Sequence, residues 1–322
     1  MSHHDHKSVR KLWAAVVVLS LTLAGMILSR CRPEEEYPVD EAPRLTETWS
    51  FGHGELKAVR IALDGVILRA DEGGFLTSRP DMVESILAQV RAAGRDPEVR
   101  AVILEVNSPG GGVTPSDEIY NELRAFRNSR EDRRIVVFIR DLGASGAYYA
   151  AMAADWIVAE PTAVVGSIGV IMQSMNVQSL SEKIGVTDVT IRSGENKDLL
   201  NPFRAVEPGQ TALLQKLIDD MHRRFSEIVS AARGLDPAGN PDLFDGRIVS
   251  ASDALSRGLV DEIGYWEDVM ARTAQMLDTD ALRVVRYKAQ QTLIELLLEG
   301  KSPVTLPNLK LHSPRFMYLW RP

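Results

Sequence analysis

Apolar residues along the middle of this chain fall into two alternating patterns. Residues 101–106 (AVILEV) and 134–140 (RIVVFIR) are continuous apolar runs of strand length, typical of strands that are buried on both faces of a sheet. In residues 80–96, 116–126 and 145–154, apolar residues instead recur at helical spacing. Strands that alternate with helices indicate βαβ units and a mainly parallel sheet. The pattern therefore predicts an α/β fold.

Further elements are predicted on both sides of this region. A strand is expected over residues 57–67, and a long amphipathic helix over 207–235 opens with proline, a favoured first helical residue. Two short helices are expected around the extended segment 258–264. A strand-like segment at 281–288 and an apolar helix at 290–300 follow. We therefore assign residues 57–277 to one folded domain and 278–322 to a C-terminal extension.

The N-terminal region carries an uncharged apolar stretch, residues 13–29, with basic residues on both sides. As a helix its 17 residues would span roughly 26 Å, which can just cross the hydrocarbon core of a bilayer. A cleaved signal peptide is the alternative, but no clean small-x-small cleavage site follows. A lipoprotein site at Cys31 is disfavoured because Arg30 precedes it. We expect an uncleaved transmembrane signal anchor.

The charges around this stretch predict its orientation. Residues 1–12 form a basic tail, whereas the acidic sequence PEEEY comes soon after the anchor. The tail is therefore expected in the cytoplasm and the body of the protein outside it. Residues 30–56 contain three prolines, an acidic run and few aliphatic residues, and are interpreted as a linker.

Composition narrows the function classes. The net charge of −7 argues against nucleic acid as a partner, because nucleic-acid binding calls for a basic face. The chain has one cysteine, so it has no intrachain disulfide framework, and a cysteine hydrolase is excluded because that residue lies outside the predicted domain. The sequence contains no His-Glu-x-x-His motif or comparable cluster of metal ligands, so metal-dependent hydrolysis is not expected. We expect neither a metal nor another cofactor.

Serine is the remaining candidate nucleophile, and it needs a base. None of the six histidines lies in a glycine-rich or strand-end setting, and His222 lies within the long helix, so a Ser-His-Asp triad is not expected. Ser145 and Lys197 offer the alternative pair. A free lysine titrates near 10.4, so its pKa must fall by about 3 units, and burial among apolar residues has that effect. The hydroxyl of Ser167 could orient the neutral amine.

Two glycine-containing segments complete the candidate site. Ser145 follows a buried strand and opens a helix, where backbone N–H groups favour negative charge, although a simple N-cap is the alternative role for a serine there. Residues 107–112 (NSPGGG) follow another strand. Consecutive glycines let a backbone approach a ligand and aim N–H groups at an oxyanion, but a plain turn would have the same composition.

Taken together, NSPGGGVTPSDEIYNEL, GASGAYYAAMAADWIVAEPTAVVGSIGVIM and SGENKDLLNPFR closely resemble the signal peptide peptidase A family, which belongs to peptidase family S49. The resemblance covers roughly residues 57–275. It implies a ClpP/crotonase-like fold of repeated ββα/βαβ units, in the short form with one copy of the domain. It assigns Ser145 as the nucleophile, Lys197 as the general base and Ser167 as the hydroxyl that positions the lysine. The oxyanion donors would be the N–H of Gly146 and that of Gly111 or Gly112.

The resemblance also implies a function: a serine endopeptidase that degrades cleaved signal peptides and similar apolar peptides at the membrane. It places the protein in the bacterial inner membrane as a single-pass protein, anchored in the bilayer by residues 13–29, with the catalytic domain extracytoplasmic. Relatives of the short form are oligomeric, so we expect a homo-oligomer. The C-terminal aromatics in PRFMYLW (314–320) are expected either at a subunit interface or docked on their own subunit.

Three alternatives stay open. A related Ser-Lys membrane peptidase with another specific substrate would be expected to carry further transmembrane spans. A crotonase-like enzyme would bind an acyl-CoA, but no basic patch for CoA is visible. A non-catalytic, oligomeric membrane-associated scaffold would keep the fold without using Ser145 or Lys197.

Overall fold

The computed structural model describes residues 45–69, 81–289 and 316–320, together with Trp13, Val16, Val17, Ser20 and Thr22. Only those five residues of the predicted anchor at 13–29 are therefore described, and the predicted helix at 290–300 lies wholly outside the described residues. Within the described part of the chain, no helix combines the length and the apolar character needed to cross a membrane. All elements below belong to the compact unit Ala42–Pro322.

Nine described strands form one sheet in the order β1-β11-β2-β3-β5-β6-β10, with β7 beside the end of β5 and β9 beside β7. All pairs in it are parallel except β1 with β11 and β7 with β9. The predicted α/β fold with a mainly parallel sheet is thus confirmed. The strands are β1 (Leu45–Phe51), β2 (Leu56–Asp64), β3 (Val99–Ser108), β5 (Arg134–Ala144), β6 (Trp156–Ala159), β7 (Val164–Gly166), β9 (Ile248–Ser250), β10 (Glu262–Ile263) and β11 (Leu282–Ala289).

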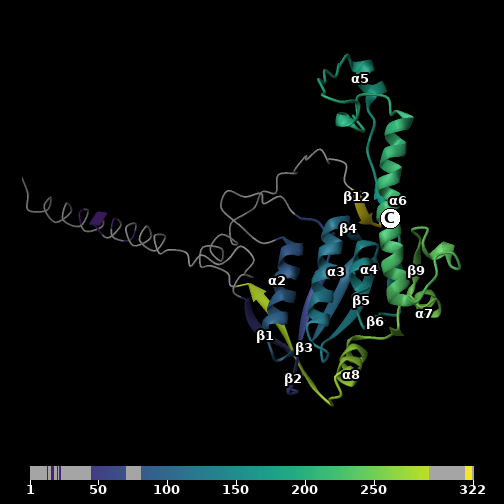
Figure 1. The fold of residues 1–322 in the computed structure, drawn as a ribbon. Helices are drawn as coiled ribbons and strands as arrows, with labels where there is room; N and C mark the ends of the chain where they lie inside the picture. Colours follow the sequence, from purple (N-terminus) through teal and green to yellow (C-terminus); the bar gives the residue numbers. More distant parts are fainter. Residues whose placement is uncertain are drawn as a thin grey trace, which may run out of the picture. The chain divides into compact units, whose positions relative to one another are not determined.

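The described helices cover this sheet and extend from it. Figure 1 shows α2, α3 and α4 side by side over one face of the sheet, with α6 running past α4. The helices are α2 (Met82–Arg95), α3 (Val113–Asn128), α4 (Gly146–Ala151), α5 (Gln178–Ile184), α6 (Pro208–Arg233), α7 (Ala251–Ser256) and α8 (Trp266–Met276), with short 3-10 turns η1 (Glu195–Asp198) and η2 (Pro241–Leu243).

The central strands bury both faces, as their apolar runs predict. Along β3, Val102 and Leu104 face the core under α2, α3 and α4, whereas Ala101 and Ile103 face a second core that α8 covers. Side chains of a strand alternate between the faces of its sheet, so a run of mostly apolar residues fills two cores at once. Strand β5, which ends just before Ser145, likewise has apolar side chains in both cores.

Two domain boundaries differ from the sequence analysis. The sequence predicts a linker over residues 30–56, but β1 lies within that range and pairs with β11. The three prolines precede β1. Most residues of β1 are threonine or aromatic, which suit a strand. Likewise β11 lies in the predicted extension 278–322, yet it joins the main sheet between β1 and β2. The sheet therefore recruits segments from both sides of the predicted domain.

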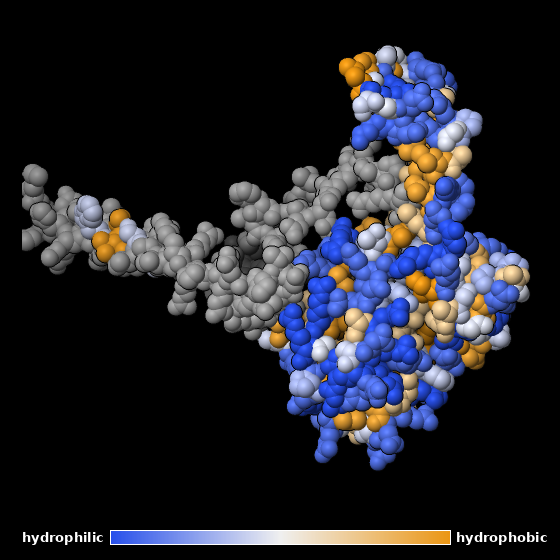
Figure 2. All heavy atoms as spheres, in the orientation of Figure 1, coloured by the Kyte–Doolittle hydropathy of each residue, from blue (hydrophilic) through white to orange (hydrophobic). Residues whose placement is uncertain are grey.

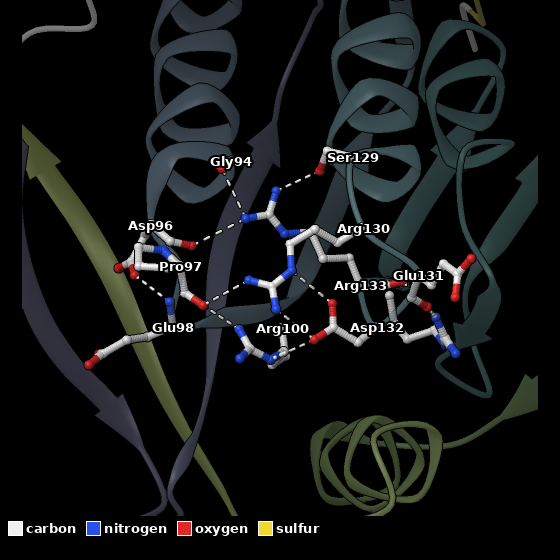
Figure 3. Close-up of polar contacts among 11 residues, drawn as sticks. Gly94, Asp96, Pro97, Glu98, Arg100, Ser129, Arg130, Glu131, Asp132 and Arg133 are labelled. Atoms are coloured by element: carbon white, nitrogen blue, oxygen red, sulfur yellow. Dashed lines mark hydrogen bonds and ion pairs between the residues drawn. The ribbon is translucent and has the colours of Figure 1, made fainter.

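A buried arginine ties the helices of the first face together. The guanidinium of Arg133, 3% exposed, donates to the carbonyl oxygens of Gly94 (2.9 Å) and Asp96 (3.2 Å) at the end of α2, and to Ser129 Oγ (2.6 Å) at the end of α3 (Figure 3). These carbonyls have no intrahelical donor, and a cation beside them is favourable. Burial lowers the pKa of Arg133. One side chain thus joins the carboxyl ends of α2 and α3.

A second, small sheet lies beside the first. It has the order β4-β12-β8, where β4 is Gly110–Gly112, β8 is Ile171–Met172 and β12 is Phe316–Leu319. Both pairings are antiparallel. Of the two expectations for the C-terminal aromatics, the structure shows docking on the same chain. β12 lies between the glycine segment and the strand that follows Ser167.

Candidate active site

Ser145 lies at the sharp turn between β5 and α4. Its φ of 54° and ψ of −116° are unusual for a residue with a side chain. The turn is held by the Ser145 N–H, which donates to the carbonyl oxygen of Gly166 (2.7 Å). Although Ser145 is the N-cap residue of α4, its side chain makes no capping hydrogen bond. The simple capping role is therefore not observed, and the hydroxyl bonds to no other described residue.

The turn requires a glycine directly after Ser145. A Cβ on Gly146 would lie 2.3 Å from Ser116 Oγ, a distance no real Cβ tolerates. Ser116 is itself held in place, because its hydroxyl donates to the Gly112 carbonyl oxygen (2.8 Å). The sequence gave no sign of Ser116, whose buried hydroxyl lies between the glycine segment and the turn at Ser145. Its position at the start of a helix made it look like any other N-terminal serine.

The backbone of the glycine segment faces the same turn. Gly112 N–H donates to the Ile67 carbonyl oxygen (2.7 Å), and Gly110 N–H donates to Ser108 Oγ (3.1 Å). The Gly111 nitrogen lies 3.1 Å from where a Cβ on Gly146 would be. Gly146 is the first residue of α4, where amides have no intrahelical acceptor. The geometry therefore favours Gly111 over Gly112 as the partner of Gly146 in an oxyanion hole.

Ser167 lies beside Ser145. Ala144 on β5 is paired with Gly166 on β7, so the residues that follow them, Ser145 and Ser167, are neighbours. Ser167 also has a positive φ, 55°, and its N–H donates to the Arg247 carbonyl oxygen (2.7 Å). It is buried, and its hydroxyl bonds to no other described residue. Two serines with free hydroxyls and strained backbones therefore meet at one edge of the sheet.

Lys197 is not brought to this site within the chain. It lies in η1 and is exposed to solvent. η1 and α5 belong to residues 173–207, which we call the arm, and Figure 1 shows α5 beyond the outer end of α6, away from the sheet. The structure thus assembles Ser145, Ser167 and the glycine amides but leaves the predicted base outside.

The arm is held together by its own polar contacts. Asp198 accepts hydrogen bonds from Arg192 and from Arg204 (3.2 Å), and Asp188 accepts from Arg204 (3.1 Å) and Asn201 (3.1 Å). The hydrogen bond from Arg192 lowers the pKa of Asp198. These contacts fold the segment around Lys197 without help from the main sheet, so the position of the lysine is set by the arm.

Histidine and metal chemistry find no support in the described residues. His222 lies on α6, and its Nε2 is buried without a hydrogen-bond partner among them, so it is not bonded to Ser145. The described residues also contain no group of three or more His, Cys, Asp or Glu side chains placed to hold a metal ion.

Comparison with known proteins places the chain in a family. Residues 127–280 match peptidase family S49. A protein of Enterococcus faecium named as a signal peptide peptidase is 33% identical over 246 residues, which cover 76% of this chain and 71% of the relative. A protein of Methanocaldococcus jannaschii named as a protease is 36% identical over 197 residues, 61% of this chain and 62% of that relative. A Synechocystis protein, also named as a protease, is 36% identical over 204 residues, 63% of this chain and 73% of the relative.

Fold, site and relatives together define a serine peptidase. More narrowly, the chain belongs to peptidase family S49, a family that uses a Ser-Lys dyad. The matched range contains Ser145, Ser167 and Lys197, whereas the glycine segment lies before it. The predicted family and enzyme class are thereby confirmed, and the roles of the individual residues stay predictions.

Proposed function

We propose that this protein is a membrane-anchored serine endopeptidase that degrades cleaved signal peptides and similar apolar peptides. The observation that carries the catalytic part is the turn at Ser145. A serine with a φ of 54°, an unbonded hydroxyl and the amides of Gly111 and Gly146 beside it has what acyl transfer requires. Strained backbone of this kind persists where the surrounding structure enforces it, and it gathers at active sites.

The reaction follows from these groups. The amine of Lys197 takes the proton of the Ser145 hydroxyl while Oγ attacks the carbonyl carbon of the scissile peptide bond. The amides of Gly111 and Gly146 hold the resulting oxyanion. The C–N bond breaks when the lysine ammonium returns the proton to the leaving amine, which leaves an ester on Ser145. A water molecule, deprotonated by Lys197, then hydrolyses this ester and releases the new carboxylate.

The lysine reaches Ser145 from a second copy of the chain in this proposal. Lys197 is exposed on the arm, away from the Ser145 of its own chain. A lysine that acts as a base must be shielded from water. Packing the arm against a neighbouring copy would shield it there and complete that copy's site beside Ser145 and Ser167. The protein would then be an obligate homo-oligomer.

The proposed substrate class and the proposed membrane anchor are supported by other observations. The Enterococcus faecium relative is named as a signal peptide peptidase. Signal peptides carry an apolar stretch and are left in the bilayer after cleavage, and residues 13–29 of this chain are apolar and long enough to lie there too. A single-pass anchor in the bacterial inner membrane, with the catalytic domain extracytoplasmic, would bring enzyme and substrate together. We also propose that the α/β fold is of the ClpP/crotonase type.

The dyad is tested by complementation with the full-length chain in detergent. Ser145→Ala and Lys197→Ala are prepared separately, and cleavage of a synthetic signal peptide is measured for each and for their 1:1 mixture. Each variant alone should lose activity by at least about 100-fold. Random mixing should restore about a quarter of the wild-type sites, since a site works when an intact Ser145 meets an intact Lys197.

Lys183→Ala is the matched control, because Lys183 is also an exposed lysine of the arm. It should keep wild-type activity. If the two variants assemble with each other but their mixture shows no peptidase activity, Ser145 and Lys197 of different subunits do not form the dyad. If Lys197→Ala stayed fully active, or the wild type neither cleaved peptides nor reacted with a fluorophosphonate, the peptidase proposal would fail and a non-catalytic scaffold would replace it. If the enzyme cleaved one particular membrane protein and no signal peptides, the alternative of a related Ser-Lys membrane peptidase with another specific substrate would be favoured.

A further inference from the structure

Asp198 directly follows the proposed base in the chain, and its carboxylate is bound by two arginines. It accepts hydrogen bonds from Arg192 and from Arg204 (3.2 Å), and its side chain is only 12% exposed. The hydrogen bond from Arg192 is the main cause of the lowered pKa of Asp198. Two guanidinium groups therefore hold this carboxylate in its charged form and in one direction.

The two arginines are themselves fixed within the arm. Arg192 also donates to the carbonyl oxygen of Glu195 (3.2 Å), and Arg204 also donates to Asp188 (3.1 Å). A guanidinium carries several donors in a planar fork, so one arginine can bind two acceptors at once. The arginines come from either side of the turn η1 in the sequence, and both reach the residue that follows Lys197.

Lys197 itself has no such partner. Its amine forms no ion pair and no hydrogen bond with the described residues, although Asp198 is its neighbour in sequence. A lysine acts as a base only when its amine is neutral, and a carboxylate within about 4–6 Å favours the charged ammonium. A free Asp198 carboxylate would therefore oppose the role proposed for Lys197.

The other charges near the lysine are exposed or already paired. The remaining charged residues of the arm have exposed side chains, which water screens, namely Glu182, Lys183, Glu195 and Glu207. Beside Ser167, which the lysine would meet on a neighbouring copy, the side chain of Arg247 is paired with Asp245 (2.6 Å) and Asp242 (3.4 Å). Asp198 is therefore the carboxylate whose pairing matters most for the base.

We infer that Arg192 and Arg204 are positioning residues for the proposed reaction, because they bind the carboxylate of Asp198 and so keep it from pairing with the amine of Lys197. This inference rests on the proposed peptidase function. A neighbouring copy that covers the arm would exclude water, and a pair between Lys197 and Asp198 would then strengthen, since charges attract more in a medium of low dielectric constant. The arginines satisfy the carboxylate and leave the lysine free to take the proton of Ser145.

The first experiment measures kcat/KM for a synthetic signal peptide against pH, with the full-length enzyme. Activity should rise with pH as the base loses its proton. Arg192→Gln removes one partner of Asp198, so we expect the rise to move to higher pH by about 0.5 unit, and by about 1 unit when Arg204→Gln is added. Below the rise, kcat/KM should fall about 3-fold and about 10-fold, whereas its value at high pH should stay within about 2-fold of wild type.

The second experiment removes the carboxylate. Asp198→Asn keeps the shape of the side chain without its charge, so adding it to the double arginine variant should return the rise to within about 0.2 pH unit of wild type. Arg192→Lys keeps the positive charge and should move the rise by less than about 0.3 unit. Arg223→Gln is the matched control, because Arg223 is also exposed and paired with an aspartate, Asp220, but lies on α6. It should leave the pH profile unchanged.

Three results would overturn the inference. The first is a pH profile that does not move in the double arginine variant, and the second is a shift that Asp198→Asn does not reverse. The third is a loss of activity that is equal at every pH, because the arginines would then only hold the arm together. Sedimentation velocity identifies this third case when the variant no longer assembles like the wild type.

Labelling with a fluorophosphonate separates this inference from the proposed function. If the wild type labels at Ser145 and cleaves the peptide, but the double arginine variant has the same pH profile, the peptidase stands and the role of the arginines is wrong. If the wild type neither labels nor cleaves, or if Lys197→Ala stays fully active, the proposed dyad is wrong and the inference fails with it.

Discussion

At the scale of single residues, the main feature is the backbone of two serines. Ser145 and Ser167 lie side by side, and both have a positive φ, a region that residues with side chains rarely adopt. Hydrogen bonds from their N–H groups to Gly166 and Arg247 hold these conformations. Strain held by neighbouring structure reduces stability, which means that the native serine at position 145 is not the residue that would make the fold most stable.

This leads to a prediction about stability. Ser145→Gly and Ser145→Ala both remove the hydroxyl, but only glycine adopts a φ of 54° without strain. We expect the glycine variant to have a free energy of unfolding about 1 kcal/mol higher than that of the alanine variant. Urea unfolding of the two variants measures this difference directly. An alanine variant as stable as the glycine variant would show that the turn is not strained.

The sequence identified candidate residues for the site but could not show how they are arranged. The serines and glycines could be found because each follows a strand in a glycine-rich segment. That Gly111 rather than Gly112 is available as a donor could not be read from three equivalent glycines. It follows from the hydrogen bond between Gly112 N–H and Ile67 O, a contact between segments far apart in sequence.

At the scale of elements, strand β3 carries a charge inside its apolar run. Glu105 is 2% exposed and accepts hydrogen bonds from Arg60 (2.7 and 2.8 Å), Arg140 (3.0 Å) and Arg286 (3.1 Å). Burial alone would raise its pKa, but the hydrogen bonds and charges of these arginines outweigh burial and lower the pKa of Glu105. The carboxylate thus links β2, β3, β5 and β11 across the sheet.

The sign of the pH dependence follows from that lowered pKa. The unfolded chain binds a proton near pH 4.3 and the folded chain only at lower pH, so the stability from Glu105 is fully present above pH 4.3 and is lost as the pH falls through the folded value. Glu105→Gln should cost about 3 kcal/mol at pH 7 and leave the arginines unpaired. The difference between variant and wild type should shrink as the pH falls below about 4.3, the ordinary pKa of a glutamate. Urea unfolding at each pH measures the difference in free energy of unfolding between the two proteins. A difference that does not change with pH would contradict the stabilising role of the Glu105 charge.

Elements differ in how well the sequence predicts them. Long elements such as α2 and α6 and the buried strands β3 and β5 show their periodicity over many residues, and the structure confirms them. β1 was predicted as linker, and β4 and β12 have three and four residues, too few for any period to be visible. These strands exist because a partner edge was available, which local sequence does not encode.

At the scale of the whole molecule, the arm exposes large apolar side chains that nothing in the described part of its own chain covers. Among its exposed apolar side chains, Ile191 is 97%, Val189 84% and Met175 76% exposed. Figure 2 shows apolar side chains on the arm and where it leaves the body. Apolar residues gathered on a projecting segment mark an interaction surface, and the arm also carries Lys197.

If a second copy covers the arm, a charge there should break the assembly. We expect Ile191→Asp to shift the protein toward smaller species in sedimentation velocity and to lower peptidase activity by at least about 10-fold, because Lys197 would no longer reach a neighbouring Ser145. Tyr265→Asp is the control, since Tyr265 is exposed on the body (58%) and should leave both unchanged. Wild-type size and activity in Ile191→Asp would show that the arm is not the interface.

Sequence alone was enough for the alternation of strands and helices, the parallel sheet, the family and the candidate nucleophile, because burial periodicity and short motifs are properties of neighbouring residues. Three features required the tertiary structure: the separation of Lys197 from Ser145, the choice of Gly111, and the pairing of strand β12 with the glycine segment. Each depends on contacts between residues far apart in the chain. The path of the backbone, and not the local pattern, determines whether such residues meet.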